Sequence, residues 1–107
     1  FPIERRVIWI REVFKNESRI EVEKYSGLTV EFCNKRGIRF ILRGLRTSAD
    51  FEFERTIGQV NKRLDQEIET VFFLTAPEYT ALNSSIVRDI LKHGGDVTQF
   101  VPENVKF

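Results

Sequence analysis

The sequence has 107 residues, of which 41% are hydrophobic and 31% are charged, so it can bury one core, and we expect a single domain over residues 1–107. The 17 Lys and Arg residues nearly balance the 16 Asp and Glu residues, which argues against nucleic acid or an acidic membrane surface as a partner. The single cysteine and the lack of a signal peptide or long apolar run favour a cytoplasmic protein.

The first part of the chain has the pattern of a helix, a strand and a second helix. Apolar residues recur at steps of three and four over residues 3–14, which predicts an amphipathic helix. Residues 19–25 alternate between polar and apolar, which predicts a half-buried strand. A second helix is expected from the cap Ser26 through Asn34, and Gly37 lies where a C-terminal cap belongs.

The rest of the chain continues the alternation. Residues 38–42 are interpreted as a strand, residues 43–47 as a polar turn, and residues 48–64 as a long helix. Residues 69–74 end with apolar side chains on both faces, which is typical of an inner parallel strand covered on each side. A last helix is expected from the cap at Asn83 to Gly94. Strands that alternate with helices predict an α/β fold with a doubly wound, Rossmann-like parallel sheet.

Ligands of such a sheet bind beyond the carboxyl ends of its strands, and a basic turn lies at one of these ends. In Arg43-Gly44-Leu45-Arg46, two guanidinium groups flank a glycine that allows the backbone to approach a ligand closely. This turn is a candidate phosphate clamp, and the alternative is an ordinary solvated basic turn.

A second candidate lies at the start of the last helix. Asn83-Ser84-Ser85 combine polar side chains with a helix N-terminus, which favours anions, although plain capping explains the same residues. Asp50 and Glu54 lie four residues apart, but no histidine joins them at metal-ligand spacing, so we interpret them as acids that stabilise the helix dipole. His93 ends its helix and is interpreted as a dipole partner.

Several of these stretches together resemble one family signature. Three segments are similar, with ungapped spacing, to the RGLR-x-x-x-DFEYE…N-R-x-L block of bacterial phosphopantetheine adenylyltransferases: Arg43-Gly44-Leu45-Arg46, Asp50-Phe51-Glu52-Phe53-Glu54 and Asn61-Lys62-Arg63-Leu64. The resemblance extends over essentially all 107 residues. It implies a member of the nucleotidyltransferase superfamily that transfers an adenylyl group from ATP to 4′-phosphopantetheine in coenzyme A synthesis, with Mg²⁺ and as a homohexamer.

The resemblance also implies roles for individual residues. Arg43 is similar to the ligand of the phosphopantetheine phosphate, and Thr29 and Asn61 are similar to residues on the pantetheine side. The implied ATP site consists of Gly44, Leu45, Arg46, Glu54, Tyr79, Thr80, Ala81, Leu82, Asn83, Ser84 and Ser85. The sequence departs from the family at Asn83, where a Ser is usual, and at Phe53, where a Tyr is usual.

The N-terminal βαβ portion of the family, with its catalytic His and a substrate-binding Lys, has no counterpart in this sequence. His93 does not match the position of that His. We therefore expect the C-terminal part of an adenylyltransferase domain, with no catalytic residue of its own and no activity by itself. The alternative is a catalytically silent module that binds nucleotides or other anions.

Overall fold

The structure, a computed structural model, describes all of residues 1–107. The chain forms four α-helices, two β-strands and two short 3-10 helices. It divides into two compact units, one made of residues 1–25 and 82–107 and the other of residues 26–81, and each is described by itself. The single domain expected from the length stays a prediction.

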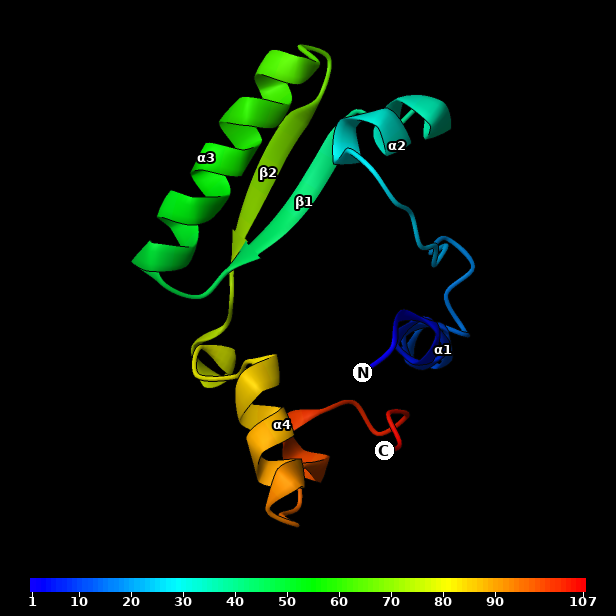
Figure 1. Cartoon of the computed structure of the whole chain (residues 1–107), viewed down its shortest axis with the longest axis vertical. Helices are drawn as coiled ribbons and strands as arrows, with labels where there is room; N and C mark the ends of the chain where they lie inside the picture. Colours follow the sequence, from blue (N-terminus) through cyan, green and yellow to red (C-terminus); the bar gives the residue numbers. More distant parts are fainter. The chain divides into compact units, whose positions relative to one another are not determined.

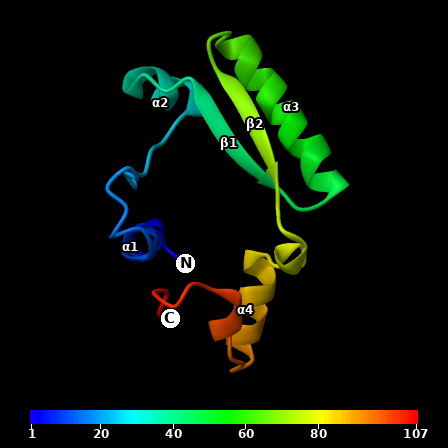
Figure 2. The same ribbon diagram turned by 180° about the vertical axis from the view of Figure 1, so that it is seen from behind.

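The unit of residues 26–81 is built around one strand–helix–strand crossover (Figure 1). Strands β1 (Phe40–Leu45) and β2 (Glu69–Leu74) pair in parallel, and helix α3 (Ser48–Leu64) connects them. Figures 1 and 2 show α3 running along β2 in both views. The α/β class and the parallel pairing predicted from the sequence are confirmed.

Helix α3 has a side-chain cap and a close approach to the sheet. The hydroxyl of Thr47 accepts a hydrogen bond of 3.2 Å from the backbone N–H of Asp50, so one of the unpaired donors of the first turn is satisfied. A Cβ at Gly58 would lie 3.3 Å from Thr70 Oγ1, so the glycine allows the middle of α3 to pack tightly against β2.

A small core fixes helix α2 (Thr29–Arg36) against the start of the sheet. Val30 and Cys33 of α2 pack with Ile68, and the partly buried Ile41 of β1 joins them. Ile68 is 2% exposed and is the largest fully buried side chain of the chain. Cys33 is buried as a small core residue, and burial raises the pKa of its thiol.

The two faces of the sheet are covered differently within this unit. Phe72 points to the helical side, where its ring contacts Phe51 of α3 with the ring centroids 5.9 Å apart. Apolar side chains on the other face are between 41% and 68% exposed, and they are Phe40, Leu42, Val71 and Phe73. The covering of residues 69–74 on both faces, which the sequence predicts, is therefore not found within the unit.

Two predictions for the segments before β1 are wrong. Residues 19–25 do not form a strand, because the unit that contains them has no strand to pair with, and alternation alone does not make a sheet. The second helix begins at Thr29 rather than Ser26, because Gly27 has a φ of 87°, which is incompatible with a right-handed helix. Gly37 ends this helix in the left-handed conformation, as predicted.

The boundaries of β1 are also shifted relative to the sequence prediction. The strand extends from Phe40 to Leu45 rather than over residues 38–42, because its pairing with β2 continues as far as Leu45 opposite Leu74. Arg43 and Gly44 consequently lie within the strand and not in the turn after it.

The unit of residues 1–25 and 82–107 contains helices α1 (Ile3–Val13) and α4 (Ser84–Lys92), which confirm the two predicted terminal helices. The ring of Trp9 on α1 meets the rings of Phe1 and Phe107, each with a centroid separation of 5.0 Å. Trp9 Nε1 also donates a hydrogen bond of 2.9 Å to the carbonyl of Lys106. None of the helices in the chain has both the length and the apolar character needed to cross a bilayer.

Candidate functional site

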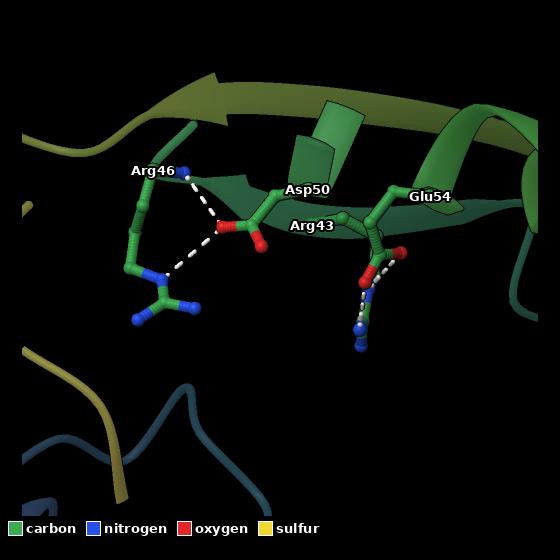
Figure 3. A network of polar contacts seen from close by, with 4 residues as sticks. All are labelled: Arg43, Arg46, Asp50 and Glu54. Atoms are coloured by element: carbon green, nitrogen blue, oxygen red, sulfur yellow. Dashed lines mark hydrogen bonds and ion pairs between the residues drawn. The ribbon is translucent and has the colours of Figure 1, made fainter. Parts of the chain in front are cut away.

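Two arginine–carboxylate pairs join the end of β1 to the first half of α3 (Figure 3). In the first pair, Arg43 Nε donates to Glu54 Oε2 at 2.9 Å, and Arg43 Nη2 donates to Glu54 Oε1 at 2.6 Å. The side chain of Glu54 is 12% exposed, whereas that of Arg43 is 51% exposed. Two parallel charge-assisted bonds fix the plane of the guanidinium group, while about half of the Arg43 side chain remains accessible to solvent.

The second pair joins Arg46, the first residue after β1, to Asp50 in the first turn of α3. Asp50 Oδ2 accepts hydrogen bonds from the backbone N–H of Arg46 at 3.2 Å and from its Nε at 3.1 Å. From the sequence, Asp50 is considered only as a dipole-stabilising acid or a metal ligand, so this contact is missed. Its only sequence signal is the spacing of four residues to an arginine just outside the helix.

The hydrogen bond from Arg43 lowers the pKa of Glu54 below the ordinary glutamate value. The carboxylate therefore remains ionised at neutral pH and available as an acceptor. The carboxylates of Glu54 and Asp50 are both engaged with arginines, and no three His, Cys, Asp or Glu side chains of the chain are arranged to hold a metal ion.

We expect the Arg43–Glu54 pair to make stability dependent on acid pH. Because folding lowers the pKa of Glu54, the ionised form stabilises the fold above the ordinary value of 4.5, and this contribution disappears as the pH falls through the lower folded value. The Glu54→Gln variant should therefore lose about 1 kcal/mol of unfolding free energy at pH 7, an amount limited by the exposure of Arg43. Urea denaturation over a pH series should show this difference shrinking below about pH 4.

Glu52→Gln is the matched control for this measurement, since Glu52 lies on the same helix but pairs with Arg55 in an exposed position. Its effect on the unfolding free energy should stay within about 0.5 kcal/mol at every pH. A loss in Glu54→Gln that is the same at pH 3 and at pH 7 would contradict the predicted role of the ionised carboxylate.

The other predicted residues of this unit lie on several elements. Gly44 occupies β1 with no atom within 4 Å of the place of a Cβ, whereas Leu45 is 5% exposed. Thr29 is the first residue of α2, and Asn61 lies on α3 about two turns after Glu54. Three further predicted residues lie at the C-terminal end of the unit: Tyr79 is the last residue of the 3-10 helix Pro77–Tyr79, and Thr80 and Ala81 follow it.

The last predicted residues, from Leu82 to Ser85, belong to the other unit. The side chain of Asn83 accepts a hydrogen bond of 3.0 Å from the backbone N–H of Ile86, so the cap predicted at the start of α4 is confirmed. Ser84 and Ser85 form the first turn, and Arg88 Nη2 donates to Ser85 Oγ at 3.0 Å. Anion binding at this helix end stays a prediction.

The pairs at the end of β1 offer a chemical capability that the individual residues do not have. A guanidinium group presents a planar set of N–H donors that suits phosphate oxygens, provided that the plane is fixed. Glu54 orients Arg43, and Asp50 orients Arg46. The two arginines are three residues apart at the carboxyl end of β1. The arrangement suits the binding of phosphate groups without any protein nucleophile.

Comparison with known proteins gives consistent matches. The profile of the cytidylyltransferase-like family matches residues 1–90. The chain is similar to the phosphopantetheine adenylyltransferase of Flavobacterium psychrophilum, with 50% identity over 106 residues, which are 99% of this chain and 70% of the relative. The same enzyme of Lachnoclostridium phytofermentans is 47% identical over 98% of this chain and 64% of its own length. That of Bacteroides fragilis is 44% identical over 99% of this chain and 70% of its own length.

Proposed function

Because this chain belongs to the phosphopantetheine adenylyltransferase family, whose wider group is the cytidylyltransferase-like family, we propose that the protein containing it transfers the adenylyl group of ATP to 4′-phosphopantetheine. The products are dephospho-coenzyme A and pyrophosphate. The observation that carries this proposal is the 50% identity to such an enzyme over 99% of the chain. The chain spans between 64% and 70% of the length of these relatives, so the proposal refers to the whole protein.

The reaction needs orientation and positive charge rather than covalent catalysis. A phosphate oxygen of the phosphopantetheine substrate attacks the α-phosphorus of ATP, and the bond from this phosphorus to the bridging oxygen of the β-phosphate breaks. Pyrophosphate leaves with that bonding electron pair. The protein holds the two substrates in line and stabilises the charge that develops on the phosphate oxygens.

The residues of this chain support a division of roles. Arg43 binds the phosphate of the phosphopantetheine substrate, and Glu54 keeps its guanidinium group in place through the two hydrogen bonds. Arg46 binds ATP phosphates beside the open space at Gly44. The resemblance to the family assigns Ser84, at the N-terminus of α4, to the triphosphate. It assigns Thr29 and Asn61 to the pantetheine arm, and the segment from Tyr79 to Ser85 to the adenine and the triphosphate.

Magnesium, a homohexamer and a cytoplasmic setting also belong to the proposal. No three His, Cys, Asp or Glu side chains of the chain are grouped to hold a metal ion. The ion would be bound through the phosphates of ATP, as is common for Mg²⁺. The assembly is tested by the solution mass of the protein.

The proposed activity is tested by incubating the protein that contains this sequence with ATP, 4′-phosphopantetheine and Mg²⁺. Chromatography should detect dephospho-coenzyme A and pyrophosphate in equal amounts, and CTP in place of ATP serves as the nucleotide control. ATP binding in calorimetry without release of pyrophosphate would support the silent nucleotide-binding module instead. Neither binding nor transfer would overturn both.

A further inference from the structure

Asp50 contacts one of the proposed ATP ligands although the family resemblance assigns it no role. One oxygen of its carboxylate, Oδ2, accepts from both the backbone N–H and the Nε of Arg46, at 3.2 and 3.1 Å. The same acid therefore holds the main chain and the side chain of one residue. This double contact differs from a simple surface ion pair, in which only the ends of two side chains meet.

The contact engages both the backbone and the side chain of Arg46 directly after the end of β1. Strand β1 ends at Leu45, so the sheet does not hold the backbone of Arg46, and the side chain has several rotatable bonds. The side chains of Arg46 and Asp50 are 33% and 31% exposed, so the pair is partly shielded from water. In Figure 3 the two terminal nitrogens of Arg46 lie on the side of the guanidinium group away from Asp50.

We propose that Asp50 is a positioning residue that orients Arg46 toward the phosphates of the nucleoside triphosphate. The inference rests on the proposed function, in which Arg46 binds ATP. Asp50 acts through Arg46 and does not contact the reacting atoms. The negative charge of Asp50 also keeps Nε of Arg46 in its hydrogen bond, so that the two terminal nitrogens of the guanidinium group are directed to the ligand.

A structural role at the start of α3 is the competing explanation, and the contacts separate it from the proposed one. Thr47 is the N-cap, and it uses the backbone N–H of Asp50. The carboxylate of Asp50 instead contacts Arg46. Removal of the cap and removal of the carboxylate can therefore be compared at the same helix end.

The test measures kcat, the KM values for both substrates and the Kd for ATP by calorimetry, in the full protein. Asp50→Ala should raise the KM and Kd for ATP about 10-fold and change the KM for the phosphopantetheine substrate less than about twofold. Asp50→Asn, which keeps an acceptor oxygen but loses the charge, should raise the KM for ATP only about threefold. Thr47→Ala should lower the melting temperature and leave the KM for ATP within about twofold.

A double-mutant cycle with Arg46→Ala makes the test decisive. Because Asp50 acts through Arg46, adding Asp50→Ala to Arg46→Ala should change the Kd for ATP by less than about twofold. A further rise of about 10-fold, or a rise of both KM values in Asp50→Ala alone, would overturn the proposal. If the unaltered protein binds ATP but transfers no adenylyl group, the proposed function fails while the Kd values still test Asp50. If it binds no ATP, both fail.

Discussion

Replacement of Arg43 by alanine is expected to lower kcat/KM for adenylyl transfer by about 100- to 1,000-fold, a loss typical of removing one oriented donor from such a transition state. The guanidinium group is held by two hydrogen bonds to Glu54, so it is oriented before the substrate binds. Most of the loss should appear as a raised KM for the phosphopantetheine substrate together with a lowered kcat. Steady-state kinetics with each substrate varied in turn measures both effects.

Two further variants define the cause of this loss. Arg43→Lys keeps the charge but not the planar fork, so it should recover only about 10-fold of the activity lost in Arg43→Ala. Arg39→Ala removes an exposed arginine that lies just before β1 and pairs with Glu67, and it should change kcat/KM by less than about twofold. A value of kcat/KM in Arg43→Ala within about threefold of the unaltered protein would refute the assignment of Arg43 to the substrate phosphate.

Local signals in the sequence were sufficient for most of the helices. Apolar periodicity predicts α1, and the cap predicted at Asn83 for the start of α4 forms its hydrogen bond to the backbone. The strand predicted over residues 19–25 does not form, for a physical reason. Alternation shows that a segment is able to form a strand, but a strand also needs a neighbouring strand to pair with, and none is present in the unit that contains these residues. Pairing is a property of distant parts of the chain and is invisible in a local pattern.

The candidate site could be predicted by residue type but not by geometry. The motif identifies Arg43 and Glu54, yet their contact spans eleven positions and depends on where β1 ends and how α3 returns along it. The contact between Arg46 and Asp50 is local, but Arg46 lies outside the helix, so helical spacing rules do not describe it. Which carboxylate accepts from which arginine can therefore be assigned only when the end of β1 is known.

The Ile68→Ala variant should lose about 2–5 kcal/mol of unfolding free energy, a large part of the stability of a small domain. Ile68 is 2% exposed and packs with Val30, Cys33 and Ile41, so truncation removes apolar contacts and leaves a cavity between α2 and the sheet. The backbone cannot readily close that cavity, since Ile68 lies directly before β2, whose first residue pairs opposite Phe40. Urea denaturation followed by circular dichroism measures the loss.

Leu64→Ala is the matched control, because it removes the same number of carbon atoms from a side chain that is 55% exposed. It should cost less than about 1 kcal/mol, since little apolar surface returns to water and alanine favours the helix. Equal losses in the two variants would show that the interior of this unit is not centred on Ile68. A large loss in Ile68→Ala alone would show that this small cluster holds α2 against β1, the strand whose end carries both arginines.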